Sequence, residues 1–450
     1  MENLSMYPNA EMRQFRRKAY VKIVDYSVSF PESNEWKKNL KGKTLDISYA
    51  GVRIETDYPL APGHMLWFTD EIKQGAGVVR WCLKLEDNYR AGIQLTDKSR
   101  TREKDEEVAE DTHYVSEELR KYNELLDSAT ERFNRELKAT EERCHDLNEN
   151  PEKLLNATQR AIEEVLTVCA EFERGVQDKD IIRTAQIRFR EKTHPIISKS
   201  YAMNRTRVWP QGSQGDYKTL ELAYKNMPLS EGIGYYLDLL MMDLPLGHAV
   251  RNRIKKLEDI LRDEILKRHQ PSLLNIACGS SRELMGLAPE IKATGARITC
   301  IDTDDDALSF AQSRLTYTGV AEQIEFRKYN ALRLFDHDLA LSDFGKQDII
   351  YSVGLFDYLP SDFLVKMFRT LYRLLNEGGA LILAFKDAAR YTHYIFHWLV
   401  DWDGFQQRRE EDFTKIIEDA GIPHSSLTEL REESGIIVFY LASKEREAGS

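Results

Sequence analysis

The sequence feature that most constrains the fold is a regular alternation of apolar runs and helical stretches, which begins at Ser272 and continues to the end of the chain. The apolar runs are rich in Ile, Val and Leu, as buried parallel strands are, and segments with helical spacing separate them. This rhythm predicts a parallel α/β sheet that helices cover on both faces. We expect the last run, which follows Gly435, to form an edge strand. The predicted strands are LLNIAC, ARITCID, QIEFRKYN, QDIIYSVG, ALILAFK and GIIVFYLASK.

Two other patterns precede this region. Short β runs with Gly, Pro, Asn and Asp turn signals, among them K-T-L-D-I-S from Lys43, extend from Tyr20 to Leu95 and predict a small β-barrel. From about Thr101 to Gln270, apolar residues recur every three or four positions among many charges, which predicts amphipathic helices. The chain is therefore expected to be multidomain. The predicted parts are a barrel over residues 1–102, a helical connector over 103–200, and an α/β domain over 201–450 with an N-terminal helical cap and a Rossmann-like core over 271–450.

The charge balance limits the partners of the chain. The net charge is −11 although residues 1–100 hold 16 Lys and Arg against 13 Asp and Glu, so the remainder is strongly acidic. Nucleic-acid binding demands a dense basic surface, and we expect no nucleic-acid partner. The sequence has no apolar run of bilayer length, no secretory-type stretch at its start and no metal-ligand spacing among its five cysteines. We expect a cytoplasmic location, no transmembrane segment and no metal.

A basic cluster near the start of the chain suggests a site for an anionic ligand. Arg13 and Arg17 form an R-x-x-x-R pattern, and Arg16 offers an alternative register for either of them. Guanidinium groups match phosphate oxygens and purine edges, and they also stack on purine faces. A basic leader that is simply solvated is the alternative.

The second part of this pattern is the turn D-I-S-Y-A-G, which begins at Asp46. Asp46 and Ser48 can offer acceptor and donor groups to a guanine edge, and Gly51 permits close backbone approach. Together with the arginines, the turn resembles the PilZ domain over about residues 10–100. The resemblance implies a receptor for the bacterial second messenger cyclic di-GMP, bound by the arginines and the turn. A purely structural barrel is the alternative.

A turn of small residues follows the first strand of the α/β region. A cofactor can approach the backbone of the segment A-C-G-S-S-R-E closely, and about 20 residues later Asp302 ends the second strand. A carboxylate at that place can accept both hydroxyls of a ribose. The turn contains Gly279 but lacks the G-x-G-x-x-G that cradles a pyrophosphate. S-adenosylmethionine, a nucleoside-bearing cofactor without phosphate, fits this pattern.

The turn resembles motif I of class I methyltransferases. The resemblance implies that Ala277 and Gly279 line the methionine part of S-adenosylmethionine and that Asp302 binds its ribose. It also implies that Asn330-Ala331, after the third strand, contact the adenine. An ordinary strand–turn–helix is the alternative. The predicted cofactor-binding residues are Asn275, Ala277, Cys278, Gly279, Asp302, Thr303, Asn330, Ala331, Ser352, Val353 and Gly354.

The end of the fourth strand limits which classes of methyl acceptor the sequence favours. It reads V-G-L-F-D-Y-L rather than the (D/N)-P-P-Y of enzymes that methylate the amines of adenine or glutamine. The segments IACGSSRE, YSVGLFDYLP, LYRLLNEGGALIL and WLVDW, within roughly residues 200–445, resemble the bacterial group for biosynthesis of 3-hydroxypalmitic acid methyl ester. This resemblance implies a fatty-acid carboxylate as acceptor.

Methylation of a carboxylate needs no general base, because the acceptor is already an anion at pH 7. A cation or a hydrogen-bond donor should hold the acid in line with the methyl group. Arg251, Arg253 and Arg390 are candidate cations, and for each the alternative is a surface ion pair. Tyr358 and Tyr391 are candidate donors. From this set we predict Tyr358, Arg251 and Arg390 as the catalytic residues.

The insertion before the last strand is rich in aromatic residues, which predicts either a channel for an acyl chain or core packing. His393 and His397 lie four positions apart there and would share a helix face, but no third metal ligand accompanies them in the sequence. We assign both histidines to packing or solvation. The aromatic residues are Tyr391, Tyr394, Phe396, Trp398, Trp402 and Phe405.

Taken as a whole, the sequence predicts a cyclic di-GMP-responsive, S-adenosylmethionine-dependent methyltransferase that O-methylates a small or fatty acid. A nucleotide-binding scaffold with an inactive methyltransferase fold and a protein methyltransferase are the alternatives. The charged helices of the connector also suggest a homodimer.

Overall fold

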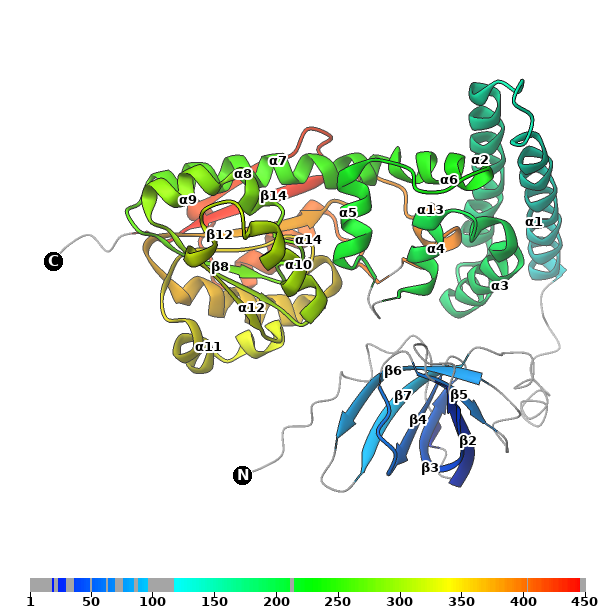
Figure 1. Ribbon diagram of the computed structural model, residues 1–450, viewed down its shortest axis with the longest axis horizontal. Coiled ribbons are helices and arrows are strands. Elements are labelled where there is room, and N and C mark those ends of the chain that lie inside the picture. Colours follow the sequence, from blue (N-terminus) through cyan, green and yellow to red (C-terminus); the bar gives the residue numbers. More distant parts are fainter. Residues whose placement is uncertain are drawn as a thin grey trace. The chain divides into compact units, whose positions relative to one another are not determined.

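The structure is a computed structural model (Figure 1). The chain divides into two compact units, each made of separate segments. The first unit comprises Met1–Ala129, Val168–Arg188 and Trp209–Ser213, and the second comprises Thr130–Thr167, Phe189–Val208 and Gln214–Ser450. The structure describes residues 18–19, 23–29, 36–48, 51–61, 64–68, 76–84, 88–95, 117–210, 214–402 and 404–445.

The first unit contains a closed β-barrel, which confirms the prediction. Its strands follow the order β1-β3-β2-β5-β6-β7-β4, and an additional pairing of β3 with β4 closes the ring. Val24, Tyr26, Ile54 and Ile93 are buried in its core. The strands are β1 (Lys18–Ala19), β2 (Ile23–Ser29), β3 (Trp36–Ser48), β4 (Gly51–Thr56), β5 (Met65–Phe68), β6 (Ala76–Lys84) and β7 (Tyr89–Leu95).

Strand β3 is longer than the sequence predicts. It begins at Trp36, whereas the apolar pattern indicates a strand only from Lys43 onward. The added segment is mostly polar, and it is held by pairing with β2, where Ser29 lies opposite Trp36 and Asp25 opposite Lys41. Pairing with a distant strand therefore extends β3 beyond its own sequence signal.

Helices occupy the middle of the chain, as predicted. Helix α1 (Glu117–Arg143) buries apolar residues at helical spacing, among them Leu126, Phe133 and Leu137. Of the helices in the described residues, none is both long and apolar enough to cross a membrane. The further helices before the second sheet are α2 (Pro151–Val176), α3 (Lys179–Ile197), α4 (Tyr201–Val208), α5 (Tyr217–Lys225), α6 (Ile233–Met242) and α7 (Pro245–Leu266).

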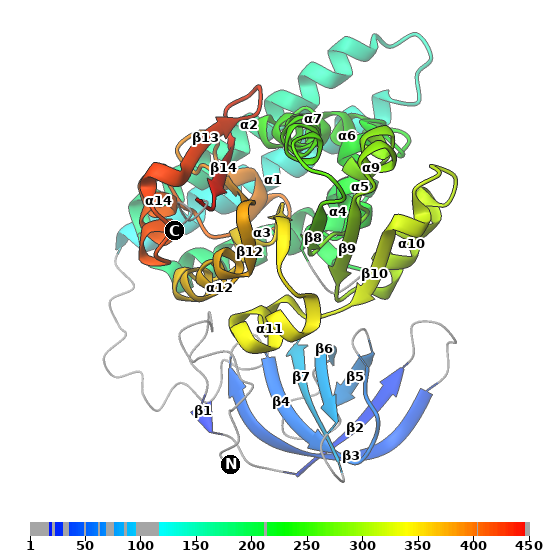
Figure 2. The same cartoon turned by 90° about the vertical axis from the view of Figure 1, so that its left-hand side faces the viewer.

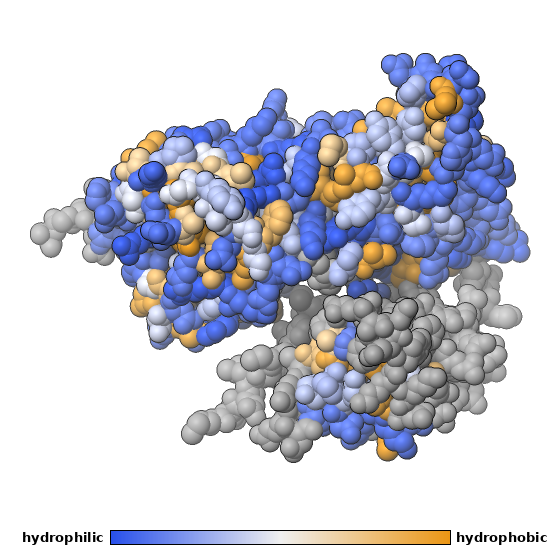
Figure 3. Space-filling view, in the orientation of Figure 1, coloured by the Kyte–Doolittle hydropathy of each residue, from blue (hydrophilic) through white to orange (hydrophobic). Residues whose placement is uncertain are grey.

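The outer face of the first two helices is polar. Figure 3 shows mainly hydrophilic side chains on the visible faces of α1 and α2. Along α1, Arg120 pairs with Glu124 and Lys121 pairs with Glu117, each four residues apart and exposed. The homodimer that the charged helices suggest stays a prediction.

The second unit contains a seven-stranded sheet with the order β10-β9-β8-β11-β12-β14-β13. Helices lie on both of its faces (Figure 2). The strands are β8 (Ser272–Ile276), β9 (Arg297–Asp302), β10 (Ile324–Lys328), β11 (Gln347–Ser352), β12 (Leu375–Lys386), β13 (Leu427–Arg431) and β14 (Ile437–Ser443). The helices after β8 are α8 (Glu283–Gly286), α9 (Ala288–Thr294), α10 (Asp305–Leu315), α11 (His337–Phe344), α12 (Ser361–Leu374), α13 (Tyr394–Trp398) and α14 (Glu410–Asp419).

The far end of this sheet corrects two expectations. The sheet is mixed rather than parallel, because β14 runs antiparallel to both β12 and β13. Strand β14 is also not the edge strand, since β13 lies outside it. Val438 and Phe439 point to opposite faces of the sheet and are both fully buried, as in an interior strand. The edge strand β13 reads L-T-E-L-R, and this partly exposed, polar segment carries little strand signal.

The strand order locates the site. Strands β8, β9, β10, β11 and β12 run parallel, so their carboxyl ends lie at one edge of the sheet. From β8 the chain adds strands first on one side, through β9 and β10, and then on the other, through β11 and β12. Ligands of open α/β sheets bind at such a reversal point, outside the carboxyl ends of the strands.

Candidate active site

The turn after β8 has a constrained backbone. Ala277, Gly279 and Ser281 have φ values of 54°, 52° and 45°. These values lie in the left-handed region, which residues other than glycine seldom adopt. Two hydrogen bonds hold the turn: the Cys278 N–H donates to the Ile301 carbonyl over 3.0 Å, and the Gly279 N–H donates to Asp302 over 2.9 Å. The end of β9 therefore fixes the turn.

Asp302 lies beside this turn, as the sequence predicts. Its Oδ2 accepts the Gly279 N–H, and its Oδ1 accepts the Asp304 N–H over 3.0 Å. A carboxylate oxygen can accept two hydrogen bonds, so each oxygen keeps capacity for a ribose hydroxyl. The structure thus brings together the two residues on which the cofactor prediction depends.

A pocket that is open to solvent lies at the turn. It is lined by residues of the turn, by residues of α5 and α7, and by Tyr351 and Val353 at the end of β11. Small side chains at the turn leave its backbone open to a ligand. The predicted cofactor residues that line this pocket are Asn275, Ala277, Cys278, Gly279 and Val353.

The other predicted cofactor residues are not among those that line this pocket. Ser352 is fully buried, and its Oγ donates to the Ile276 carbonyl over 2.8 Å, which joins the ends of β11 and β8. Asn330 accepts the Leu332 N–H over 3.0 Å and caps a short 3₁₀-helix. Thr303 and Ala331 follow β9 and β10, and Gly354 follows β11 with a φ of 106°.

Helix α5 is tied to the cofactor turn by a buried carboxylate that the sequence did not reveal. Glu221 accepts hydrogen bonds from Ser280 Oγ at 2.7 Å, from Arg282 Nη1 at 3.0 Å and from Arg314 Nη1 at 2.8 Å. Burial by itself would raise the pKa of Glu221, but the hydrogen bonds from Arg314 and Ser280 hold that pKa below its ordinary value. Glu221 is therefore ionised and clamps α5 over the turn.

A second buried carboxylate lies in the pocket wall. Glu283 follows the turn and lines the pocket, and its Oε1 accepts hydrogen bonds from Tyr351 Oη at 2.9 Å and Asn275 Nδ2 at 3.0 Å. Burial raises the pKa of Glu283 above its ordinary value. Glu283 lies only four residues after Gly279, and this short separation is the sequence signal that places it beside the turn.

Of the three candidate arginines, Arg253 lines the pocket. It is on α7 and only 3% exposed, and its Nη2 donates to Tyr224 Oη on α5 over 2.9 Å. Its Nη1 lies 3.6 Å from the position that a Cβ on Gly354 would take, so the guanidinium reaches the turn after β11.

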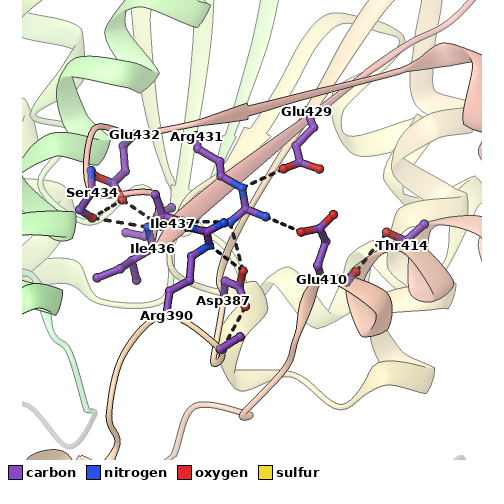
Figure 4. Close-up of polar contacts among 12 residues, drawn as sticks. Asp387, Arg390, Glu410, Thr414, Glu429, Arg431, Glu432, Ser434, Ile436 and Ile437 are labelled. Carbon is purple, nitrogen blue, oxygen red and sulfur yellow. Dashed lines mark hydrogen bonds and ion pairs between the residues drawn. The ribbon is translucent and has the colours of Figure 1, made fainter.

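The two arginines predicted as catalytic are engaged elsewhere. Arg251 Nη1 donates to the Met242 carbonyl at the end of α6 over 2.9 Å. Arg390 is exposed, and its Nε bonds to Asp387 over 3.3 Å beside Arg431 (Figure 4). Neither is among the residues that line the pocket. Their catalytic role stays a prediction.

Tyr358 is the third predicted catalytic residue, and it lies in an aromatic cluster. Trp402 Nε1 donates to Tyr358 Oη over 2.7 Å. The ring of Phe405 contacts those of Tyr358, Trp402 and Phe396 with centroids 6.0–6.5 Å apart. Burial is the main cause that raises the pKa of Tyr358 well above its ordinary value.

The remaining residues of the aromatic insertion pack against their neighbours. Trp398 is fully buried and meets Phe189 edge-on, with centroids 5.7 Å apart, so it belongs to the core. The rings of His393 and His397 contact each other with centroids 4.8 Å apart. The ring of Tyr394 packs on that of His393, with centroids 4.4 Å apart. Trp398 therefore packs in the core, and the assignment of His393 and His397 to packing or solvation stays a prediction.

The nucleotide turn of the barrel is described in part. Arg13, Arg16 and Arg17 lie outside the described residues. Asp46 and Ser48 end β3, and Ser48 pairs with Gly51 at the start of β4. A Cβ on Gly51 would lie 2.5 Å from the Ile93 carbonyl oxygen of β7, so a glycine is required there for strand packing alone.

Two family models match the chain. Residues 11–107 match the PilZ domain, and residues 273–379 match the methyltransferase domain. An uncharacterized protein of Haemophilus influenzae is 28% identical over 110 residues, which are 24% of this chain and 40% of that protein. The chain thus matches less than half the length of this relative.

Solved structures align with parts of the chain at low identity. A crystal structure of a Bordetella parapertussis protein is 16% identical with a TM-score of 0.44, and the match covers 71% of this chain and 97% of that one. The magnesium protoporphyrin IX methyltransferase of Synechocystis PCC 6803, crystallised with bound S-adenosylmethionine, is 16% identical with a TM-score of 0.33. The match covers 44% of this chain and 84% of that one.

The methyltransferase match begins in β8 and ends in β12, so it contains the small-residue turn, Asp302 and the strand ends that surround the pocket. S-adenosylmethionine is the cofactor of this domain, and cyclic di-GMP is the ligand of the PilZ domain. The chain therefore joins a PilZ domain to an S-adenosylmethionine-dependent methyltransferase domain.

Proposed function

We propose that the whole protein transfers a methyl group from S-adenosylmethionine to the carboxylate of a small or fatty acid, under the control of cyclic di-GMP. The observation that carries the acceptor class is the bond between Trp402 Nε1 and Tyr358 Oη. Because that oxygen already accepts, the phenol can direct its own proton to a ligand. Its raised pKa keeps the phenol protonated, so Tyr358 can donate to a carboxylate but cannot act as a base.

The other polar groups near Tyr358 also suit an acceptor that needs no base. An alcohol or amine would have to lose a proton, whereas a carboxylate would not. Asp357 is already bound, because one oxygen accepts the Lys386 N–H and the other pairs with Lys386 Nζ. That ammonium also lies 5.1 Å from the ring centroid of Phe405. Asp357 is thus neutralised by its own partner.

The chemistry requires positioning more than proton transfer. S-adenosylmethionine supplies a methyl group on a sulfonium sulfur, so that a carboxylate oxygen forms the new C–O bond as the C–S bond breaks and no proton moves. The turn at Gly279 and the Asp302 carboxylate orient the nucleoside, and the Tyr358 hydroxyl orients the acid.

A 3-hydroxy fatty acid is the first acceptor to test, because the sequence resembles the group that makes 3-hydroxypalmitic acid methyl ester. The buried rings of Phe396 and Phe405 and the half-buried ring of Trp402 form one aromatic cluster with Tyr358, which we propose as the contact region for an acyl chain. All five cysteines are free thiols, which suits the cytoplasmic location that we propose.

Control by cyclic di-GMP requires that the nucleotide bind two arrangements of the chain with different affinity. Helices α1, α2 and α3 each contribute residues to both compact units. We place the coupling in these helices, because each helix is continuous from a segment of one unit into a segment of the other.

The test uses the full-length protein, S-adenosylmethionine with a deuterated methyl group, and a panel of short and 3-hydroxy fatty acids. Mass spectrometry should find a labelled methyl ester, and its rate should change when cyclic di-GMP is added. Label in protein bands would instead establish a protein methyltransferase. Cofactor binding without transfer to any acid or extract component would establish the scaffold.

A further inference from the structure

Arg253 is a buried cation that forms no direct ion pair with any described residue. Its side chain is only 3% exposed, and its Nε has no hydrogen-bond partner. Its Nη2 bonds to the Tyr224 hydroxyl, which is neutral. Among the described residues, no carboxylate lies within salt-bridge distance of this guanidinium.

Such a charge is costly unless an anion joins it. Removing a guanidinium from water without a counter-ion destabilises the folded state. Burial works against the charged form, but the neighbouring Tyr224 and Asp357 hold the pKa of Arg253 above its ordinary value, so the group stays charged. The side chain is thus prepared for an anionic ligand.

The position of Arg253 indicates which anion it meets. It shares one pocket with Ala277 and Gly279, the residues expected to line the methionine part of the cofactor. S-adenosylmethionine carries one anionic group, the α-carboxylate of that part, and a guanidinium fork matches a carboxylate in shape.

The same pocket also contains the opposite charge. Glu283 lines it and is held by Tyr351 and Asn275, and it forms no ion pair with Arg253. One buried cation and one buried carboxylic acid that do not pair with each other match the two ends of an α-amino acid. An acyl chain with a single carboxylate would bring no cation to Glu283.

We infer that Arg253 binds the α-carboxylate of S-adenosylmethionine and that Tyr224 on α5 positions its guanidinium. This inference rests on the proposed function only in its choice of cofactor. Because α5 carries Tyr224 and is held to the turn by Glu221, this one helix connects Arg253 to the cofactor turn. The sequence suggests Arg253, like Arg251 and Arg390, as a cation for the acceptor acid. This inference assigns Arg253 to the cofactor instead.

The test compares two ligands that differ in the amino-acid end. S-adenosylhomocysteine carries the α-carboxylate, and 5′-methylthioadenosine lacks the whole amino-acid group. Calorimetry on the full chain should show that Arg253→Met weakens S-adenosylhomocysteine binding by about 10- to 100-fold and leaves methylthioadenosine binding unchanged. Lys255→Met is the control, because Lys255 is exposed on the same helix.

Other outcomes overturn the inference. Equal losses for both ligands would mean that Arg253 only supports the pocket. Unchanged S-adenosylhomocysteine binding, with a raised KM for the acid, would assign Arg253 to the acceptor. If Arg253→Met fails to fold, Arg253→Lys is the second variant, because it keeps the charge but removes the forked guanidinium. It should weaken the binding of S-adenosylhomocysteine and not that of methylthioadenosine. The comparison needs no acceptor, so failure to find an ester does not affect it, whereas a wild type that binds neither ligand would refute both proposals.

Discussion

The backbone N–H of Gly279 donates a 2.9 Å hydrogen bond to Oδ2 of Asp302, which joins the turn after β8 to the end of β9. The other oxygen of the same carboxylate accepts the Asp304 N–H and so shapes the turn that follows β9. One side chain therefore organises both turns around the nucleoside position. A change at either residue should act on the same ligand.

Gly279→Ala should separate the binding role of the turn from its backbone strain. Alanine at a φ of 52° costs about 1 kcal/mol, and its Cβ would meet only Tyr217 Cβ at 3.8 Å. Gly319→Ala is the matched control, with a φ of 78° and nothing within 4 Å. Both variants should lose similar stability in urea unfolding, but only Gly279→Ala should weaken S-adenosylhomocysteine binding. Equal affinity in the two variants would contradict the cofactor site.

Tyr358→Phe should lower kcat/KM for the acid by about 10-fold, because it removes one hydrogen bond to the acceptor carboxylate. The affinity for S-adenosylhomocysteine should not change. Tyr317→Phe serves as the control, since Tyr317 is 95% exposed. Steady-state kinetics that show equal rates for both variants would remove Tyr358 from the acceptor site.

Glu221→Gln should destabilise the second unit by about 2 kcal/mol at pH 7, because it weakens hydrogen bonds from two arginines to a buried charge. The pKa of Glu221 is lowered in the folded state, so its contribution is present at neutral pH and is lost as the pH falls through that pKa. Wild type and variant should therefore converge in acid. Glu325→Gln, which breaks an exposed pair with Arg327, should cost less than about 1 kcal/mol.

Glu283→Gln should change the pH dependence in the opposite sense. Burial raises the pKa of Glu283 in the folded state, so the folded protein holds this proton more tightly than the unfolded chain. The free energy of unfolding therefore decreases as the pH rises above the ordinary value of 4.5. Thermal unfolding between pH 4 and pH 7 should show a smaller decrease in the variant, and an identical slope would refute this assignment.

Cyclic di-GMP binding should depend on the basic leader and on the turn after β3. Arg17→Ala and Asp46→Ala should each weaken binding by about 10-fold or more in calorimetry, because each removes a charge-assisted contact. Lys41→Ala removes an exposed positive charge from the same barrel and should have little effect. Unchanged affinity in the first two variants would reject the proposed nucleotide residues.

Much of the fold could be predicted from local sequence patterns, and so could the turn of the proposed cofactor site. A run such as LLNIAC before Gly279 specifies a buried strand, and small residues after it specify a tight turn. Because parallel strands end at one edge, Asp302 had to lie near that turn once both strands were recognised. The structure places the two residues as expected, since each step depends on residues close in the sequence.

The choice among the arginines shows where local pattern stops. Arg251 and Arg253 are two residues apart on α7, which turns their side chains about 200° from each other. One reaches the carbonyl at the end of α6, and the other enters the pocket. Nothing in the spacing distinguishes them, because only the packing of α7 against the sheet decides which face is turned inward.

The amino-acid sequence by itself determined the kinds of elements, the order of the two domains, and the turn and carboxylate of the proposed cofactor site, since periodicity and turn chemistry act over a few residues. Tertiary structure alone decided that β13 takes the edge outside β14, that Glu221 clamps α5, and that Arg253 rather than Arg251 lines the pocket. These features depend on pairing and burial between segments far apart in the chain, where the free energy comes from contacts that no local pattern records.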